Sequence, residues 1–526
     1  MSQPTDFKQA PGRLLANRRQ MLLMMGAAGT APLLAKTALA QGTPTKGGVL
    51  KIAAPFNPSS LDPFTGGGGS DHMVLYPIFD TLVDFEPETL AAKPGLATSW
   101  EFTDPKTLVL TLRQGVRFHD GEVFDAAAVK ANLERAKSDD RSSVRGDLQS
   151  LESVEVISPD KVALKLRNPD TALPLILADR AGMMSSPKAF AGKGREYDRT
   201  PVGTGPFKFD TWADNDRVVL SKNPDYWDKD NIHLDGMVFQ IITDLNTGLR
   251  SVVANENHFA YRFNPQQKLV AERMGSKIVV SATPTIADYH LVFNYSRKPL
   301  NDVRVRQAIN YAVDRDGFNK AALLGLGVPA QTMLPPGYWA HDESLNDFYT
   351  YDPDKARSLL AEAGYKDGLD IQFFGNADQA SQQRHEIIIE QLRKVGIRAQ
   401  LTSGSNADMY QRFMVRGEGD MIMTLWTGRP DPSLPFLLVY GENGFNNAGK
   451  VPPPPEMLEA QIESQSAADQ EGRKKAFARL ERAALEHALS CEVAFVPGIE
   501  VYTPNVKGYQ PNLLGKPKFH TIWLES

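Results

Sequence analysis

Residues 425–432 (LWTGRPDP) hold several side chains that could bind a polar ligand. Arg429 could clamp a carboxylate, sulfonate or phosphate through two hydrogen bonds, or it could pair internally with Asp431 or another acid. Trp426 could stack on an apolar or planar ligand group, or it could anchor the core. Asp431 could bind an amine, or it could be the turn residue of an Asp-Pro pair. Trp426, Thr427, Arg429 and Asp431 are therefore candidate ligand-binding residues.

The patterns of common enzyme and metal sites are absent from the sequence. The tetraglycine at residues 66–69 is followed by Ser-Asp-His, whereas a phosphate-binding loop requires Gly-Lys-Ser/Thr. Neither G-x-S-x-G nor H-E-x-x-H occurs, and the nine histidines are scattered along the chain. Cys491 is the single cysteine, so a disulfide within the chain and a thiolate metal cluster are both excluded. We therefore expect no catalytic residues, no metal site and no cofactor.

The composition is that of a large globular protein. The chain has 526 residues, of which 42% are hydrophobic, which is enough for two or three domains. The formal charge of −5 argues against a nucleic acid as partner.

The first forty residues differ from the rest of the chain. They carry five basic side chains and one acid, with Arg18-Arg19 ahead of a short apolar stretch. An A-x-A-like cleavage site ends at Ala40. Residues 1–40 are thus predicted to be a twin-arginine signal peptide, which leaves a soluble mature chain after cleavage near Ala40. The alternative is an amphipathic helix or a membrane anchor.

Local patterns predict mixed secondary structure. Residues 46–56 resemble a first strand, and residues 71–82 a short helix. Residues 87–195 have the pattern of a compact α+β unit, with a helix that Asp125 could cap. From about residue 295 to 495, strands alternate with helices, as in an α/β lobe.

Several segments match one known family in the same order along the chain. The arrangement resembles the periplasmic solute-binding proteins of peptide-type ABC transporters, which include dipeptide, oligopeptide and nickel binders. The resemblance covers essentially the whole mature chain. It rests on residues 47–50 with 61–63, 96–100 with 112–121, 203–207, 223–227, 305–312 and 352–356.

This resemblance implies an α/β fold of the periplasmic binding protein type (type II, cluster C). Two lobes would enclose a ligand cleft, and one of them would carry an extra inserted α+β domain. The implied limits are residues 41–86, 196–290 and 496–526 for a discontinuous lobe I, 87–195 for an inserted domain II, and 291–495 for lobe III.

The resemblance also gives residues 425–432 a specific meaning. In dipeptide-binding relatives this stretch carries an acid that takes the α-amino group of the ligand, and here that place is occupied by Arg429. A cation there would repel an ammonium group, which suggests a ligand other than an ordinary dipeptide. On lobe I, Phe56, His72 and Tyr76 flank the tetraglycine and are further candidates for lining the cleft.

The function implied is that of the substrate-binding component of an ABC importer in the periplasm. It would capture a peptide or a peptide-like, anionic small solute and deliver it to a permease and its ATPase, and we expect it to be a monomer. Two alternatives stay open at this point: a nickel or metallophore binder of the same family, and an exported periplasmic hydrolase.

Overall fold

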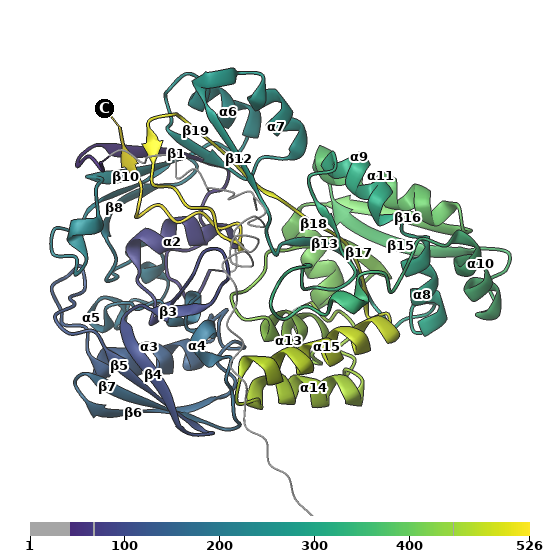
Figure 1. The fold of residues 1–526 in the computed structure, drawn as a ribbon, viewed down its shortest axis with the longest axis horizontal. Helices are drawn as coiled ribbons and strands as arrows, with labels where there is room; N and C mark the ends of the chain where they lie inside the picture. Colours follow the sequence, from purple (N-terminus) through teal and green to yellow (C-terminus); the bar gives the residue numbers. More distant parts are fainter. Residues whose placement is uncertain (1–42, 67–68, 445, 526) are drawn as a thin grey trace, which may run out of the picture. The chain divides into compact units, whose positions relative to one another are not determined.

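The computed structural model describes residues 43–66, 69–444 and 446–525, of which those from residue 44 onward belong to one compact unit (Figure 1). The predicted signal peptide at residues 1–40 lies outside the described residues. Among the described residues, no helix has both the length and the apolar character that crossing a membrane requires.

The first large sheet has seven strands drawn from distant parts of the chain. Strand β1 lies near its centre and pairs in parallel with β10 and β11, whereas the other pairings are antiparallel. In spatial order the strands are β12 (Val279–Thr283), β19 (Gly498–Tyr502), β11 (Phe259–Tyr261), β1 (Val49–Ala54), β10 (Gly236–Ile241), β9 (Arg217–Lys222) and β8 (Phe207–Ala213).

The second large sheet has six strands. Strand β15 pairs in parallel with β16 and β17, and β13 pairs antiparallel with β17 and β18. The order is β14 (Val328–Pro329), β18 (Ser490–Phe495), β13 (Asp288–Phe293), β17 (Met421–Trp426), β15 (Leu369–Asn376) and β16 (Ile397–Gly404).

A smaller antiparallel sheet of four strands is formed within residues 97–166. Its order is β4 (Ala97–Asp104), β5 (Thr107–Leu112), β7 (Lys161–Leu166) and β6 (Leu151–Ser158). Two short hairpin-like pairs complete the strands: β2 (Val83–Phe85) with β3 (Ala92–Pro94), and β20 (Val506–Lys507) with β21 (Trp523–Leu524).

The helices pack mainly against these sheets, and α14 and α15 run side by side (Figure 1). Before residue 290 the helices are α2 (His72–Ile78), α3 (Ala126–Ser138), α4 (Leu173–Ile176), α5 (Pro187–Phe190), α6 (Leu245–Val253) and α7 (Pro265–Glu272). After it they are α8 (Val303–Ala312), α9 (Arg315–Leu323), α10 (Pro353–Glu362), α11 (Gln379–Arg393), α12 (Asn406–Tyr410), α13 (Ser433–Tyr440), α14 (Pro455–Ser466) and α15 (Gln470–Glu486).

Two short segments connect the large sheets. The chain passes from β12 to β13 through residues 284–287, and it returns from β18 to β19 through residues 496–497. Thr285 Oγ1 donates a hydrogen bond of 2.7 Å to the Val496 carbonyl, so the two segments lie next to each other. The six-stranded sheet falls in the range predicted for lobe III, except that β13 begins at Asp288 rather than after residue 290.

The predicted α/β class is confirmed, as are the best-specified local elements. Helix α3 begins after Asp125, whose side chain accepts a hydrogen bond of 2.9 Å from the Ala128 amide. Helix α10 begins with Pro353 after the cap residue Asp352, an order that is typical of a helix start. The helix predicted over residues 71–82 is shorter and ends at Ile78, because Phe79 takes an extended backbone conformation.

Candidate functional site

A small cavity of about 160 Å³ lies between the two large sheets. One wall comes from β11, the start of α7, β19 and residues 514–516, all within the range predicted for lobe I. The opposite wall comes from α9, α11 and the end of β17, within the range predicted for lobe III. A place between two lobes is where a solute can be enclosed and separated from water.

The charged side chains of this cavity are mostly cationic. Among the residues that the structure describes, Arg262, Arg384 and Lys516 line it together with one acid, Glu500. Arg262 lies over the ring of Phe56 at 5.1 Å, and Arg384 lies over the ring of Tyr289 at 4.4 Å. These aromatic contacts orient both guanidinium groups without neutralising their charge.

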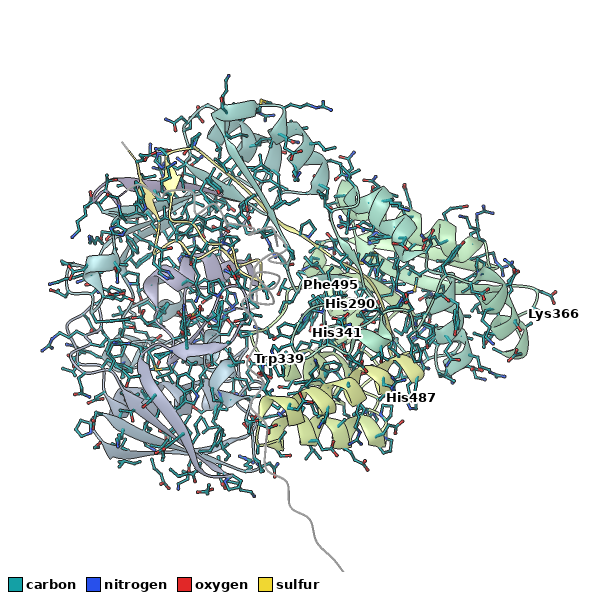
Figure 2. The ribbon with its side chains drawn as sticks, viewed as in Figure 1. His290, Trp339, His341, Lys366, His487 and Phe495 are labelled. Atoms are coloured by element: carbon teal, nitrogen blue, oxygen red, sulfur yellow. The ribbon has the colours of Figure 1, made fainter. Side chains whose placement is uncertain are left out.

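A larger cavity, of about 1020 Å³, lies on other parts of the same boundary. Its walls are rich in apolar and aromatic side chains, among them Trp100, Phe102 and Trp339, which is labelled in Figure 2. It shares Thr285, Val496 and Pro497 with the smaller cavity, so both touch the segments that connect the sheets. We take the smaller cavity as the candidate site because it holds the convergent charged groups.

The end of β17 brings the predicted segment to the cavity. Thr427 directly follows β17 and lines the cavity, and its Oγ1 atom would lie 3.2 Å from a Cβ placed on Gly69. Gly428 has a φ of +69°, and an added Cβ would approach the side chain of Ile286 to 2.5 Å. Glycine therefore allows the chain to turn closely past Ile286 at this point.

Trp426 is buried, with 8% of its surface exposed, and packs in a hydrophobic core cluster. Its backbone pairs with Asp288 of β13, which fixes the end of the strand. Its indole Nε1 has no hydrogen-bond partner among the described residues. Trp426 is thus placed as the alternative of a core anchor predicted, and its indole N–H is a buried donor without an acceptor among the described residues.

Arg429 pairs with an acid other than Asp431. Its Nη1 donates a hydrogen bond of 3.2 Å to Asp179 Oδ2, and Asp179 lies directly before the short helix η2 (Arg180–Gly182). His72 Nε2 lies 2.6 Å from the other oxygen of Asp179, and Lys516 Nζ lies 3.8 Å from Oδ2. One buried carboxylate therefore collects three nitrogen-bearing side chains from separate parts of the chain.

The electrostatics of this cluster, which we call the Asp179 cluster, follow from burial and from its charges. Burial alone would raise the pKa of Asp179, but Lys516, His72 and Arg429 outweigh it and hold that pKa well below its usual range. Burial, aided by Lys516, lowers the pKa of His72 to about 3. A neutral His72 with its proton on Nε2 can then donate to the Asp179 carboxylate. Burial also lowers the pKa of Lys516 to about 8, although Asp179 acts in the opposite direction.

Asp431 lies in a different environment, and the amine-binding interpretation does not fit it. Its Oδ1 accepts hydrogen bonds from the amide and the hydroxyl of Ser433, at 2.9 and 2.6 Å. Arg473 Nη2 lies 2.8 and 2.9 Å from the two carboxylate oxygens, and Asp431 is fully buried. Asp431 is thus the turn residue that begins α13, and it does not line the small cavity.

The other predicted residues lie around the same region. Tyr76 is buried next to His72, with ring centroids 5.5 Å apart, and its hydroxyl has no partner among the described residues. Burial and the charge of Asp179 raise the pKa of Tyr76 well above its ordinary value. Phe56 is 40% exposed and touches the cavity only through Arg262. Of these predicted residues, only Thr427 lines the cavity itself.

Sequence reasoning missed the charged residues that the fold brings to the cavity and to the Asp179 cluster. They are Asp179, Arg262, Arg384, Glu500 and Lys516. None lies in a recognisable motif, and each comes from a different segment of the chain. The one available signal was charge in otherwise apolar surroundings, as at Glu500 within the strand sequence GIEVY.

No metal-binding group stands out in the part of the chain that the structure describes. Within residues 43–66, 69–444 and 446–525, no three His, Cys, Asp or Glu side chains are grouped so that they could hold a metal ion. His290, labelled in Figure 2 beside β13 and β18, is fully buried and lies 2.9 Å from Asp288 within its own strand.

Comparison with known proteins gives a consistent result. The family model described as "Bacterial extracellular solute-binding proteins, family 5 Middle" matches residues 91–447. The glutathione-binding protein GsiB of Salmonella paratyphi A is 34% identical over 414 residues, which cover 76% of this chain and 79% of that protein. GsiB of Escherichia coli K12 is 33% identical over 396 residues, or 73% of this chain and 76% of that protein.

Solved structures share the fold. The periplasmic binding protein DppA from Helicobacter pylori, in complex with the peptide STSA, is 25% identical with a TM-score of 0.82, covering 92% of this chain and 99% of that one. The protein AgaA from A. tumefaciens R10, in complex with agropinic acid, is 24% identical with a TM-score of 0.82, covering 91% and 99%. The predicted fold of the periplasmic binding protein type is thus confirmed.

Proposed function

The chain belongs to the bacterial extracellular solute-binding proteins of family 5, and we propose that it binds a small peptide-like solute that carries carboxylate groups. It is a solute-binding component of an ABC importer and delivers its solute to a membrane permease. Its relatives are binding proteins of transporters rather than enzymes. We propose that this chain also carries out no reaction on what it binds.

One observation carries the choice of ligand class: of the described residues that line the small cavity, three are cationic and one is an acid. Lys516 is the most informative of them, because it is 4% exposed and its Nζ makes no hydrogen bond to any described residue. A buried ammonium without a hydrogen-bond acceptor is costly, and a ligand carboxylate would supply the acceptor. Arg262 and Arg384 can contact further carboxylate oxygens from the facing walls.

The relatives support a peptide-like ligand. GsiB proteins are named as glutathione-binding, and the DppA structure holds a peptide. Glutathione is a peptide with two carboxylates and one ammonium group, so it matches an excess of cations in the cavity. We therefore take reduced glutathione and small acidic peptides as the first ligands to test.

The experiment is a titration of the purified mature chain with glutathione, dipeptides and acidic peptides, followed by calorimetry and thermal unfolding. A ligand at one hundred times its Kd should stabilise the native state by about 2.7 kcal/mol. The variant Lys516→Met should bind the best ligand at least about tenfold more weakly, since a buried charged hydrogen bond is lost. Lys366→Met is the control, because Lys366 is exposed and lies beyond α10, away from the cavity (Figure 2).

Two results would contradict the proposal. If no peptide or carboxylate binds, the ligand class is wrong. If the Lys516→Met and Lys366→Met variants bind the same ligand equally well, the cavity is not where the carboxylate is held. Arg429→Ala tests the anion-clamp hypothesis in the same way: equal affinity for an acidic ligand with and without this arginine would exclude a direct contact.

We propose further that three bodies move as units, with the limits implied by the sequence: lobe I (41–86, 196–290 and 496–526), domain II (87–195) and lobe III (291–495). The observation in favour is that the seven-stranded and six-stranded sheets are joined only through residues 284–287 and 496–497. Two adjacent connecting segments are suited to a hinge motion around a bound ligand. Solution scattering with and without ligand would test this, and an unchanged radius of gyration would argue against closure.

Export by the twin-arginine route and a monomeric state also belong to this proposal. The support for export is Arg18-Arg19, the apolar stretch that follows and the cleavage pattern at Ala40. Replacing both arginines by lysine should leave the protein inside the cell in its uncleaved form. Continued export of that variant would rule out the twin-arginine route, and sedimentation of the mature chain would give its oligomeric state.

A further inference from the structure

Two buried side chains of opposite charge in the same cavity each have a polar atom without a hydrogen-bond partner among the described residues. Lys516 Nζ and Glu500 Oε2 each make no hydrogen bond to any residue that the structure describes, and the two residues are 4% and 3% exposed. Both line the small cavity between the large sheets. Since neither atom has a partner, the two do not hydrogen-bond to each other, and both are available to a ligand.

The backbone of β19 fixes the position of Glu500. Glu500 lies in the middle of this strand, opposite Tyr261 of β11 on one side and Ser281 of β12 on the other. A residue paired on both sides in a sheet has little freedom to move its Cβ. The carboxylate is therefore a preformed part of the cavity wall.

Burial raises the pKa of Glu500 to about 7, although hydroxyl groups of Ser281 and Tyr509 act in the opposite direction. Burial and the charge of Glu500 both raise the pKa values of the neighbouring Tyr502 and Tyr509. The cations that share its cavity are Arg262, Arg384 and Lys516. A carboxylate in such surroundings gains much from a cationic ligand group that donates a hydrogen bond to it.

We infer that Glu500 is the subsite for a free ammonium group of the ligand, so that the solute is a zwitterion held at one end by Glu500 and at the other by Lys516. This inference rests on the proposed function, because it concerns the same cavity. It assigns the ammonium to the wall of the seven-stranded sheet rather than to residues 425–432. The acid expected there, Asp431, is already paired with Arg473, and Arg429 is a cation.

Among the described residues that line the cavity, Glu500 is the only acid, so no other carboxylate there competes for this role. Asp179 lies 3.8 Å from Lys516 but does not line the cavity, and its two oxygens already receive His72 and Arg429. The cavity therefore offers an acid for the ammonium group of a solute and cations for its carboxylate group. A solute whose amine is blocked would lose the contact with Glu500 and keep the contacts with the cations.

The experiment compares matched ligand pairs by calorimetry at pH 7.5. The pairs are reduced glutathione with its N-acetylated form, and dialanine with N-acetyl-dialanine. The native protein should bind the free-amine member of a pair at least about tenfold more tightly, which is the range expected for a charge-assisted hydrogen bond. Glu500→Gln, which keeps the side-chain shape, should reduce this preference to less than about threefold. Glu486→Gln, at an exposed position of α15, should leave it unchanged.

A second readout separates a ligand contact from a merely structural role. At pH 6.5 most of Glu500 is protonated in the free protein, so an arriving ammonium should release up to about three quarters of a proton, measured as the dependence of the binding enthalpy on the buffer. Lys516, with a pKa of about 8, stays charged at this pH and contributes little. The release should be absent with the N-acetylated ligand and in Glu500→Gln.

The outcomes distinguish this inference from the proposed function. If the native protein binds both members of a pair equally well, the ammonium subsite is wrong and the carboxylate-binding function stands. If the free amine is preferred but Glu500→Gln, shown to be folded by circular dichroism, keeps that preference, Glu500 is not the subsite. If no member of either pair and no other acidic peptide binds, both the function and the inference are overturned.

Discussion

Arg429 and Asp179 lie 250 positions apart in the chain, and Arg429 Nη1 donates a hydrogen bond of 3.2 Å to Asp179 Oδ2. The pair joins the segment after β17 to the short loop before η2, which belong to the ranges predicted for lobe III and domain II. The same carboxylate also receives His72 of α2. A single buried acid therefore connects three regions of the fold next to the candidate cavity.

We predict that Asp179→Asn is strongly destabilising. It removes the one anion that His72, Arg429 and Lys516 share, and an uncompensated buried charge costs about 3–5 kcal/mol. Urea unfolding measures the loss. The control is Asp370→Asn, because the Asp370–Arg398 pair has similar distances of 2.8 Å but is more than half exposed. That variant should lose less than about 1 kcal/mol, and equal losses in the two variants would contradict the prediction.

We predict that Asp431→Asn lowers stability without changing ligand affinity. The carboxylate accepts from Ser433 at the start of α13 and pairs with Arg473 of α15, and it does not line the small cavity. Loss of this buried pair should cost about 3 kcal/mol or more in urea unfolding. Calorimetry below the unfolding range should give an affinity for the best ligand within about twofold of the native value. A large loss of affinity in a folded variant would restore Asp431 as a ligand contact.

We predict that affinity for a carboxylate ligand without an amine falls as the pH rises above about 8, the pKa of Lys516. The sign follows because the ammonium form, present below this pKa, binds the anion. The measurement belongs in the Glu500→Gln background, so that the carboxyl group with a pKa of about 7 does not contribute. The pH dependence should vanish when Lys516→Met is added, and an unchanged profile in that double variant would assign it to another group.

We predict a contribution of Asp84 to stability that is lost in acid. Asp84 Oδ1 accepts from Lys518 at 2.6 Å, and Lys93 lies 3.5 Å from the other oxygen. Burial opposes ionisation, but the two lysines outweigh it and lower the pKa of Asp84 to about 2. The unfolded chain has a pKa of about 3.9, so the contribution of about 1–2 kcal/mol is present above pH 4 and lost as the pH falls towards 2.

The check is the difference in unfolding free energy between the native protein and Asp84→Asn, measured at pH 5 and at pH 3. The difference should shrink at the lower pH. Asp140→Asn is the matched control, since that side chain is fully exposed and forms a surface ion pair with Arg145. If the unfolding free energies of the native protein and Asp84→Asn fall by the same amount between pH 5 and pH 3, Asp84 is not the group whose contribution is lost in acid.

Much of the local structure could be predicted because its causes lie within a few residues. Asp125 and Asp352 begin helices through hydrogen bonds to amides three positions later, at 2.9 Å in each case. The short turn at residues 158–160 joins β6 and β7, and its Ser-Pro-Asp sequence is typical of such a turn. The family could be predicted for a related reason: its motifs are short local segments, and they occur in the same order along this chain.

The sequence by itself identified candidate ligand-binding residues near the end of β17, but it did not determine what each of them contacts. The sequence offered Asp431 or another acid as a partner for Arg429, and only the folded chain brings Asp179 within hydrogen-bond distance. Glu500 is signalled in the sequence only as a charge within an apolar strand, and Lys516 not at all, because burial and the approach of distant groups decide their pKa values. Those quantities depend on how segments hundreds of residues apart pack together, and only the tertiary structure determines that.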